Sequence, residues 1–335
     1  MALYLSAGDV ETLATPELVM SAARKAVIAE RDGRAVIPPR LDVDLPRGFL
    51  RVMPGAVGDV MGLKVMTLVR GIGNRYLLLV YSQTTGELEA LLDADEVTRL
   101  RTAGMTAMAG EILQPEPQSE LGLVGSGFEA ATHLRAMARL WPLERVSVFS
   151  PRRQHRETFA ERHSLELGID VQAVESSREA VRAAETIVLA TKATQPVIDG
   201  QYLRPGSVVL SIGSTRPDLR ELDRRTLARA AVLVVDDAAS VLRESGDVID
   251  AVAHDAITPE HLMSLGAAAE SPRVRNRSIE RDLGVFKSVG TAVQDLALAG
   301  ELISAARRCE LGRELGELTR LKAAPATAPV AGEAV

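Results

Sequence analysis

The sequence is poor in cysteine and in aromatic residues. Cys309 is the single cysteine among 335 residues, and Phe, Trp and Tyr together make up 3% of the chain. One cysteine cannot close a disulfide within the chain, so we expect a reducing compartment, the cytoplasm. With so few aromatic rings, we do not expect a surface that stacks the bases of single-stranded nucleic acid.

Long apolar runs and an excess of positive charge are also absent. No stretch approaches the roughly 18 apolar residues that a membrane-spanning helix needs, and the N-terminus carries no basic segment followed by an apolar one. We therefore expect neither an embedded nor a secreted protein. The net charge is -6, from 39 basic and 45 acidic residues. This balance gives no bulk attraction to nucleic acid. The five histidines lack metal-ligand spacing, and we expect no metal site.

What remains is the composition of a globular protein long enough for two domains. Hydrophobic residues make up 46% and charged residues 25% of the chain. Thr15 and Pro16 begin an apolar-periodic segment that predicts a helix as far as Gly33. Short runs bounded by Pro and Gly then predict a largely antiparallel sheet. Its strands are expected at 36–43, 48–53, 61–69, 76–81 and 87–92, with a helix following at 95–113.

A second region begins after the proline-containing segment 114–117. There, β-branched runs alternate with helical patterns, which predicts a doubly wound parallel sheet of the Rossmann type. The strands are expected at 121–124, 146–149, 171–174, 186–190, 207–212 and 231–235, and the helices at 129–140, 152–167, 178–184 and 218–230. A helix at 291–308 is long enough to return to the first region. We therefore predict an α/β fold in which a Rossmann domain, 115–291, is inserted into a discontinuous α+β domain, 1–114 plus 292–322. The Ala- and Pro-rich end, 323–335, is expected to be a flexible tail.

A glycine-rich turn between the first predicted strand and helix of this second region is the sharpest local feature. It reads Gly125-Ser126-Gly127-Phe128-Glu129-Ala130. In a dinucleotide site, the first glycine makes the tight turn, the second lets the backbone approach the pyrophosphate, and the small third residue packs the helix on the sheet. An ordinary glycine turn is the alternative. The complete βαβ unit around this turn favours the dinucleotide site.

The end of the next predicted strand bears on which dinucleotide is bound. An NAD site usually has a carboxylate there for the ribose diol, but this sequence has Ser150, Arg152 and Arg153. A serine and an arginine can bind a 2′-phosphate, so NADP(H) is preferred and NAD(H) remains possible. Arginines at a helix start are unfavourable against the helix dipole, which argues that they serve a function.

Several motifs in order resemble the ornithine cyclodeaminase and mu-crystallin family of NAD(P)-dependent enzymes over nearly the whole chain. The motifs are Ile37-Pro38-Pro39-Arg40, Arg51-Val52-Met53-Pro54-Gly55, Gly62-Leu63-Lys64-Val65, Leu100-Arg101-Thr102-Ala103-Gly104, the glycine turn, Arg216-Pro217-Asp218-Leu219-Arg220-Glu221-Leu222-Asp223, Phe286-Lys287-Ser288-Val289-Gly290 and Gln294-Asp295-Leu296-Ala297. The resemblance implies that the discontinuous domain binds substrate and forms a homodimer.

The resemblance also implies roles for individual residues. Arg40 and Arg101 would bind the substrate carboxylate, with Met53 and Val289 beside the substrate, and Lys64 would be catalytic. A guanidinium can orient a planar carboxylate, and a lysine can protonate or polarise an adjacent imine nitrogen. Lys64 lies in an apolar strand pattern, where a solvated lysine is unusual. The implied cofactor-binding residues are Gly125, Ser126, Gly127, Phe128, Glu129, Ser150, Arg152, Arg153, Thr191, Ile212 and Ser288.

Departures from the family pattern decide among its activities. Where ornithine cyclodeaminases resemble this chain but carry a catalytic Asp, this sequence has Thr215, which cannot act as a carboxylate base. Asp218 is interpreted as a favourable carboxylate in the first turn of a helix, and Asp236 and Asp237 as a helix-capping pair. Glu129 stands where many relatives have Gln.

We therefore predict an NAD(P)H-dependent reductase of α-imino acids, or equivalently an amino-acid dehydrogenase. Two alternatives stay open. One is an ornithine cyclodeaminase that uses bound NAD without net redox change, and the other is an NADP-dependent protein that binds a small carboxylate ligand without turnover. The substrate's side chain is not predicted.

Overall fold

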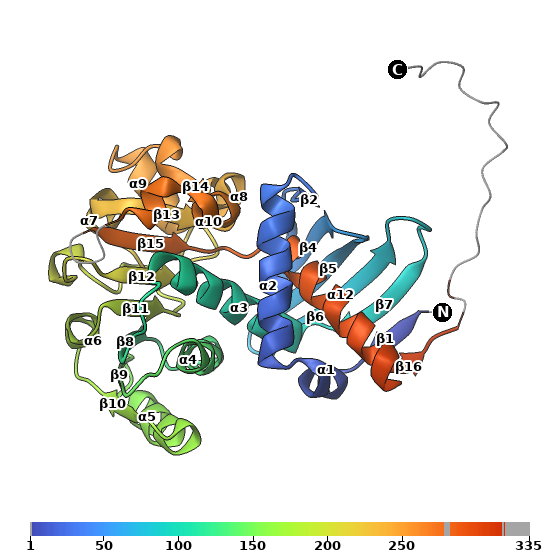
Figure 1. The fold of residues 1–335 in the computed structure, drawn as a ribbon, viewed down its shortest axis with the longest axis horizontal. Coiled ribbons are helices and arrows are strands. Elements are labelled where there is room, and N and C mark those ends of the chain that lie inside the picture. The colour runs from blue at the N-terminus through green and yellow to red at the C-terminus, as the bar shows by residue number, and fades with distance from the viewer. Residues whose placement is uncertain (1, 278–281, 317, 319–335) are drawn as a thin grey trace.

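The computed structural model describes residues 2–277, 282–316 and 318. Two β-sheets lie side by side along the long axis of the molecule, and the helix α3 (Asp95–Leu113) runs from one to the other (Figure 1). The predicted tail 323–335 and part of the predicted segment 292–322 lie outside the described residues. The boundaries of the predicted domains stay predictions. The predicted α/β fold class is confirmed.

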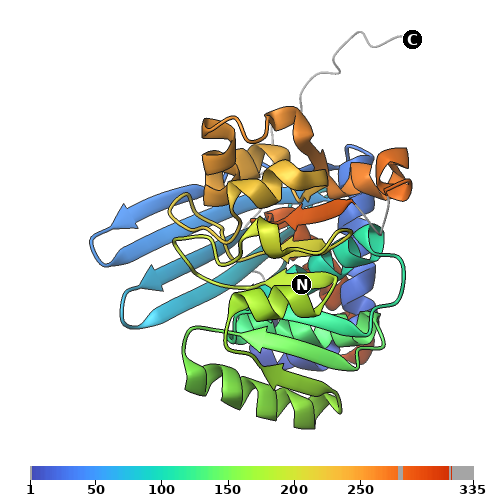
Figure 2. The ribbon, with the colours of Figure 1, turned by 90° about the vertical axis from the view of Figure 1, so that its left-hand side faces the viewer.

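The first sheet is mostly antiparallel, as predicted. Its strands pair in the order β16-β1-β7-β6-β5-β4-β2, with β3 beside β4. The strand bounds are β1 Leu3–Leu5, β2 Ala35–Val36, β3 Leu41–Leu45, β4 Gly48–Val57, β5 Val60–Val69, β6 Gly73–Ser82, β7 Leu88–Asp93 and β16 Arg313–Glu314. One pair, β1 with β7, is parallel. The strands β4, β5 and β6 are long and project from the body of the molecule (Figure 2).

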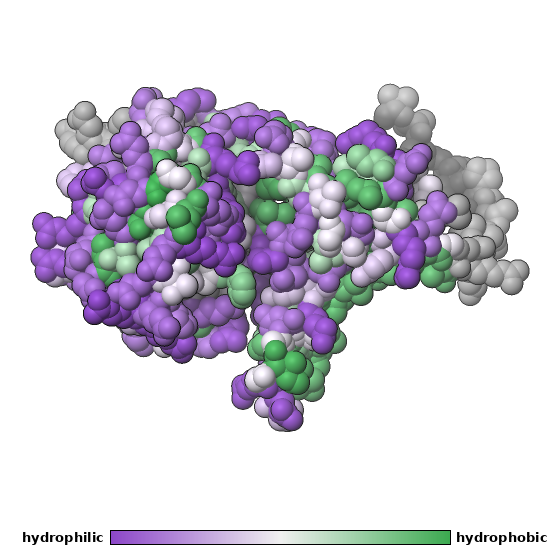
Figure 3. All heavy atoms as spheres, turned by 90° about the horizontal axis from the view of Figure 1, so that it is seen from below, coloured by the Kyte–Doolittle hydropathy of each residue, from purple (hydrophilic) through white to green (hydrophobic). Residues whose placement is uncertain are grey.

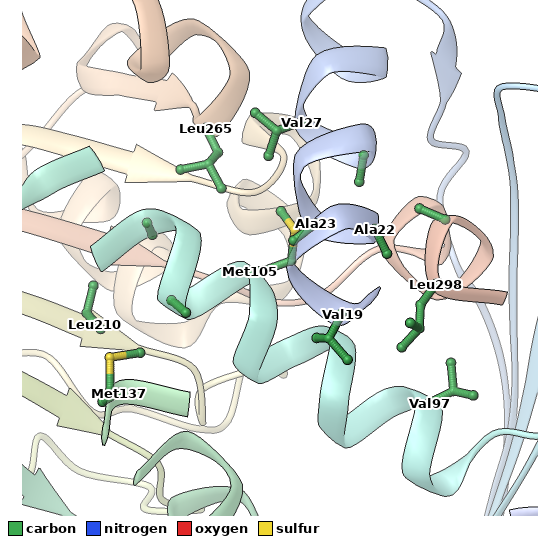
Figure 4. Packing of buried hydrophobic residues seen from close by; sticks show 14 of the residues in the cluster. Val19, Ala22, Ala23, Val27, Val97, Met105, Met137, Leu210, Leu265 and Leu298 are labelled. Atoms are coloured by element: carbon green, nitrogen blue, oxygen red, sulfur yellow. The ribbon is translucent and has the colours of Figure 1, made fainter. Parts of the chain in front are cut away.

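Helices cover one face of this sheet. They are α1 (Ala7–Leu13), α2 (Pro16–Arg31), α3 and α12 (Ala292–Cys309). The helix α12 contacts α2, α3, β4 and β5, so the C-terminal helix returns to the first sheet as predicted. Val19 of α2, Val97 of α3 and Leu298 of α12 belong to a single buried hydrophobic cluster (Figure 4). This packing holds α12 against β4 and β5, and α3 against β6.

The second sheet is parallel throughout its described strands. Its order is β10-β9-β8-β11-β12-β15-β13-β14, the doubly wound arrangement predicted from the alternating pattern. The strand bounds are β8 Glu120–Val124, β9 Arg145–Phe149, β10 Asp170–Ala173, β11 Thr186–Leu189, β12 Val208–Ser211, β13 Ala230–Val235, β14 Leu262–Ser264 and β15 Leu283–Lys287. The carboxyl ends of parallel strands share one edge, which in such sheets is where ligands bind.

Helices and short 3-10 turns complete the second sheet. Their bounds are α4 Phe128–Leu140, α5 Arg153–Leu167, α6 Ser177–Ala183, α7 Arg224–Arg229, α8 Ala238–Glu244, α9 Gly246–Ala253, α10 Leu265–Glu270, α11 Pro272–Arg275, η1 Gly200–Tyr202 and η2 Pro259–His261. No helix within the described ranges has the length and apolar character required to cross a membrane.

The second sheet differs from the expectations in one helix and two strands. The helix expected at 218–230 begins only at Arg224, because Asp223 caps it with a hydrogen bond from the Thr226 amide, and 216–223 form turns. The edge strand β14 was not predicted, and neither was β15, which lies inside the sheet between β12 and β13. Its short sequence, Leu-Gly-Val-Phe-Lys, contains a glycine and ends in a lysine, so it lacks the uninterrupted β-branched pattern of its neighbours.

Candidate active site

Lys64 is buried on the inner face of the first sheet. In β5 it stands opposite Met53 of β4 and Leu78 of β6, so the three side chains share one face. Lys64 is 2% exposed, Met53 6% and Leu78 0%. The lysine that the apolar sequence pattern indicated as unusual is therefore buried, together with its ammonium group. A buried charge is stable only with a partner of opposite sign.

That partner is Asp295, in the first turn of α12. Its Oδ2 lies 2.7 Å from Lys64 Nζ, and its Oδ1 accepts a hydrogen bond of 2.9 Å from Arg101 Nε. Arg101 Nη1 also donates to Gln294 Oε1 at 2.7 Å. One fully buried carboxylate thus joins the predicted catalytic lysine to a predicted carboxylate-binding arginine. In the sequence, Asp295 was noted only as part of a family motif, and no role was predicted for it.

The environment lowers the pKa of Lys64 to about 8. Burial is the main cause, and the positive charges of Arg101 and Arg40 act in the same direction, while Asp295 opposes them. An ammonium group with a pKa this near neutrality can give up its proton during a reaction and recover it from solvent. The pKa suits a general acid.

Arg40 lies just before β3 and contacts the segment that links β15 to α12. Its Nη2 donates to the backbone oxygens of Val289 at 3.2 Å and Gly290 at 2.9 Å, and forms an ion pair with Glu244 of α8. Gly290 has φ +77°, and a Cβ at this position would lie 2.5 Å from Arg101 Nη1. The link therefore passes between the two arginines, and it places the Val289 oxygen beside Arg40.

Asp236 anchors this link from the end of β13. Its carboxylate accepts hydrogen bonds from Ser288 Oγ at 2.7 Å and from the amides of Val289 and Gly290, the latter at 2.6 Å. The capping interpretation holds for Asp237, which accepts from the Ser240 amide at the start of α8, and is wrong for Asp236. Ser288, a predicted cofactor-binding residue, is 3% exposed, and its hydroxyl is bound to Asp236.

The glycine-rich turn has a geometry that fits a dinucleotide pyrophosphate. Gly125 has φ +126°, and a Cβ there would lie 2.4 Å from the Ala190 oxygen, so only glycine fits. At Gly127 a Cβ would meet no atom within 4 Å, so the backbone faces open space. The helix α4 starts there without a side-chain cap, which leaves its first amides available to an anion. A cavity of about 430 Å³ adjoins the turn, lined by Ser126, Gly127, Phe128 and residues of α5.

The end of β9 holds the residues predicted to select NADP. Ser150 Oγ accepts a 2.8 Å hydrogen bond from Ser126 Oγ, which ties this strand end to the glycine turn. Arg152 is the exposed N-cap residue of α5, which has no side-chain cap. Arg153 instead pairs with Glu157 at 2.7 Å, one turn along the same helix. The two arginines are therefore not equivalent, and Arg152 is the one beside an uncapped helix start.

Thr191 and Ile212 follow the neighbouring strands β11 and β12. The Thr191 amide and hydroxyl both donate to Oε1 of Glu221, at 2.6 and 2.9 Å, and Ile212 is 5% exposed. Glu221 also accepts from Ser211 Oγ and from the Gly213 amide, each at 2.8 Å. This fully buried carboxylate fixes both loops at the carboxyl edge. The Thr191 hydroxyl therefore donates its hydrogen bond to Glu221 within the protein.

The two departures from the family pattern, Thr215 and Glu129, and the neighbouring Asp218 lie in different surroundings. Burial raises the pKa of Glu129, and Arg101 opposes this rise, so Glu129 lies within electrostatic reach of the cation cluster. Asp218 is 62% exposed and pairs with Arg216 at 2.7 Å in a turn, so its interpretation as a helix-start carboxylate was wrong. The Thr215 amide donates to the Gly213 oxygen.

Comparison with known proteins identifies similar chains of nearly the same length. The model of the ornithine cyclodeaminase/mu-crystallin family matches residues 2–307. The ketimine reductase mu-crystallin of Mus musculus is 32% identical over 310 residues, which cover 88% of this chain and 95% of that protein.

Two solved structures are also similar over most of the chain. The Δ1-pyrroline-2-carboxylate reductase of Thermococcus litoralis, in complex with NADH and L-proline, has 30% identity and a TM-score of 0.86, with 93% of this chain and 100% of that chain covered. An archaeal alanine dehydrogenase dimer with bound NAD has 26% identity and a TM-score of 0.85, with coverages of 93% and 98%.

Proposed function

This chain belongs to the ornithine cyclodeaminase/mu-crystallin family, and from that premise we propose that it is an NAD(P)H-dependent reductase of α-imino acids. The observation that carries the proposal is the buried contact of Lys64 with Asp295, which Arg101 shares, beside the link that Arg40 contacts. Three cations and a glycine-rich turn suit a small anionic substrate with a dinucleotide. The mouse and Thermococcus relatives are reductases, and the archaeal relative is a dehydrogenase.

The substrate carboxylate would lie between the two arginines. Arg101 uses Nε and Nη1 within the protein, and among the described residues nothing accepts a hydrogen bond from its Nη2. Within the part of the chain that the structure describes, Arg40 donates from Nη2, and its Nε and Nη1 have no acceptor there. A carboxylate that bridges these free N–H groups would satisfy both guanidinium groups, because charged hydrogen bonds of this kind are strong and directional.

Lys64 would then act as the proton donor. In an α-imino acid the C=N bond adjoins the carboxylate, so a carboxylate held by the arginines brings the nitrogen toward the ammonium of Lys64. Bound NAD(P)H supplies a hydride to the imine carbon. The nitrogen takes a proton from Lys64 as the C=N π bond becomes a C–H and an N–H bond, and solvent returns the proton to the lysine. The reverse reaction oxidises an amino acid.

The preferred cofactor is proposed to be NADP(H). Arg152 is exposed at the uncapped start of α5, next to Ser150, where a 2′-phosphate would meet a guanidinium, a hydroxyl and backbone amides. No carboxylate occupies the end of β9 to bind a ribose diol. The two solved structures contain NADH and NAD, which lack the 2′-phosphate. The proposed preference for NADP(H) therefore differs from these relatives and rests on Arg152.

A homodimer through the outer face of the first sheet is proposed as well. Leu41, Val52, Val65 and Leu77 stand in one row on this face, opposite the side that carries Lys64. Leu41 is 62% and Leu77 40% exposed, and Val43, Leu45 and Met61 are exposed nearby. Hydrophobic residues also show on the projecting part in Figure 3. Exposed apolar patches of this kind mark interfaces, and the archaeal relative is a dimer. The single cysteine supports a cytoplasmic location.

The test is oxidation of NADPH and NADH with a panel of candidate substrates. The panel contains pyrroline-2-carboxylate, piperideine-2-carboxylate, and pyruvate or oxaloacetate with ammonia, and ornithine with NAD is scored for proline. We expect turnover of an imino acid with NADPH preferred, and a loss of ~10²–10⁴-fold in kcat for Lys64→Ala. Lys25→Ala removes an exposed lysine of α2 and serves as the matched control. Proline from ornithine without net redox change would establish a cyclodeaminase instead, and saturable ligand binding without turnover would establish a binding protein.

A further inference from the structure

Asp295 lies behind the reacting groups and is shared by two cations from different elements. Lys64 comes from β5, Arg101 from α3 and Asp295 from α12, and the carboxylate gives one oxygen to each cation. All three side chains are buried, at 2%, 8% and 0% exposure. Without the carboxylate, the buried ammonium group of Lys64 would lack a partner of opposite charge, and a buried unpaired charge is costly.

The surroundings leave few ways to hold the two cations otherwise. Lys64 is flanked on the sheet by Met53 and Leu78, which offer no polar atom suited to an ammonium group. Thr98 Oγ1 is 3.3 Å from Lys64 Nζ, a weak contact, and its own proton is donated to the Ala94 oxygen. The Asp295 carboxylate is therefore the strong partner that orients the ammonium group of Lys64.

We propose that Asp295 is a positioning residue that fixes the separation and orientation of Lys64 relative to Arg101. The proposal rests on the proposed function, in which Arg101 holds the substrate carboxylate and Lys64 protonates the adjacent nitrogen. In an α-imino acid these two groups are separated by a single carbon, so the donor and the carboxylate-binding group must keep a fixed spacing. A carboxylate that bridges both cations sets that spacing before substrate arrives.

The same contact favours the protonated form of Lys64. Four sets of groups face this lysine: Asp295 from α12, Arg101 and Thr98 from α3, Arg40 from the segment before β3, and the apolar Met53 and Leu78. Burial and both arginines lower the pKa of Lys64, and Asp295 raises it. Without the negative charge, the lysine would lose its proton at a lower pH.

Two substitutions separate charge from position. Asp295→Asn keeps the shape and removes the charge, whereas Asp295→Glu keeps the charge and moves it by about one carbon–carbon bond. For Asp295→Asn we expect kcat to fall ~10²-fold near neutral pH, and the alkaline limb of the kcat profile to move to lower pH. For Asp295→Glu we expect the limb to stay near its wild-type position while kcat remains at least ~10-fold lower.

The control is Asp42→Asn. Asp42 holds Arg51 with hydrogen bonds of 2.6 and 2.7 Å on the same sheet, without contact to Lys64. The kcat–pH profile of Asp42→Asn should keep its alkaline limb at the wild-type position. Cofactor affinity, measured by fluorescence titration, should be unchanged in both Asp295 variants. If Asp295→Asn keeps the wild-type limb, or if Asp295→Glu keeps wild-type kcat, the proposal is wrong. If Asp295→Asn does not fold, Asp295→Glu decides alone by the same criterion.

Failure of the proposed function would give a different result. Wild-type protein that turns over no member of the panel contradicts the reductase, and thermal unfolding then tests Asp295. In Asp295→Asn the protonated Lys64 would be buried without its negatively charged partner. The variant's loss of stability relative to wild type should therefore grow as pH falls through about 8, where Lys64 of the wild type becomes protonated. A deficit in Tm that is equal on both sides of this pH would overturn the role of Asp295 in holding the charge.

Discussion

Arg40 forms an ion pair with Glu244 that joins the first sheet to the second. Arg40 precedes β3, and Glu244 is the last residue of α8, packed with the second sheet. Burial raises the pKa of Glu244, and Arg40 opposes the rise. A carboxylate of the protein therefore already occupies one side of the guanidinium that is proposed to bind the substrate carboxylate.

This arrangement predicts that lysine cannot replace Arg40. An ammonium group cannot contact Glu244, the backbone oxygens of the link and a substrate carboxylate at once. For Arg40→Lys we expect KM for the imino acid to rise ~10–100-fold, the cost of losing one charged hydrogen bond. Steady-state kinetics check it. Glu244→Gln keeps the shape and removes a competing carboxylate, so its KM should stay within about threefold of wild type. Equal losses in both variants would contradict the proposed role of Arg40.

Gly290 should not tolerate a side chain. In Gly290→Ala the new Cβ would lie 2.5 Å from Arg101 Nη1 at a residue with φ +77°. We expect a stability loss of about 1–3 kcal/mol, because of the strained backbone, and a higher KM, because Arg101 is displaced. Denaturant unfolding and kinetics measure the two effects. Gly300→Ala on α12, where a Cβ meets no atom within 4 Å, is the matched control and should be neutral or slightly stabilising. A Gly290→Ala variant with wild-type KM would be inconsistent with this geometry.

The two arginines after β9 should differ in their effect on cofactor choice. Arg152→Ala is expected to raise KM for NADPH ~10-fold or more and to leave KM for NADH nearly unchanged, because only NADPH carries the 2′-phosphate. Arg153 is already paired with Glu157, so Arg153→Ala should change the ratio of the two KM values less than about twofold. Identical KM values for NADPH in Arg152→Ala and wild type would argue against the preference for NADP(H).

Lys287 should contribute strongly to stability although it is not proposed to touch substrate. Its fully buried ammonium lies 3.3 Å from Asp247 Oδ2 and donates to Ser211 Oγ at 3.1 Å, with Glu221 at 4.0 Å. Lys287→Met would leave two buried carboxylates without their cation, at a cost of about 3–5 kcal/mol in the free energy of unfolding. The measurement is chemical denaturation at neutral pH. The double variant with Asp247→Asn should recover part of this loss, and no recovery would show that Asp247 is not the relevant partner.

Glu30 should destabilise the protein at alkaline pH. Burial, Asp236 and Asp237 raise its pKa from 4.5 to about 8. A carboxyl with a raised pKa in the folded state contributes full stability below its unfolded pKa and loses it as pH rises through the folded value. Above about pH 8, Glu30→Gln should therefore have a higher Tm than wild type and a free energy of unfolding larger by about 1–2 kcal/mol after solvent screening, with no difference well below pH 4.5.

The control for Glu30 is Glu17→Gln on the same helix. The pKa of Glu17 is lowered by hydrogen bonds at the helix start, so its loss should reduce stability at higher pH. Melting curves over the pH range test both variants. If Glu30→Gln were no more stable than wild type at alkaline pH, the carboxyl of Glu30 would not be raised in pKa by its surroundings.

The sequence by itself determined the parts of this protein that depend on local pattern. Alternating strands and helices predicted the doubly wound sheet, and the periodic segments gave α2, α3 and α12 to within a few residues. The glycine turn was predicted because a tight turn and a close approach to phosphate require residues without a Cβ at fixed spacing. The apolar pattern around Lys64 marked a lysine that is in fact buried. The signals for the helices, the glycine turn and Lys64 each lie within about twenty consecutive residues, whereas the alternation that predicts the second sheet extends over residues 121–235.

Only the tertiary structure decided which buried charges meet. Asp295 lies far along the chain from both Lys64 and Arg101. Asp236 follows β13 and accepts a hydrogen bond from the hydroxyl of Ser288, which follows β15. The strand β15 escaped prediction because its place between β12 and β13 comes from sheet pairing, which its short sequence does not encode alone. Contacts between distant elements depend on how helices and strands pack together, and a periodic pattern in one segment carries no information about its partner.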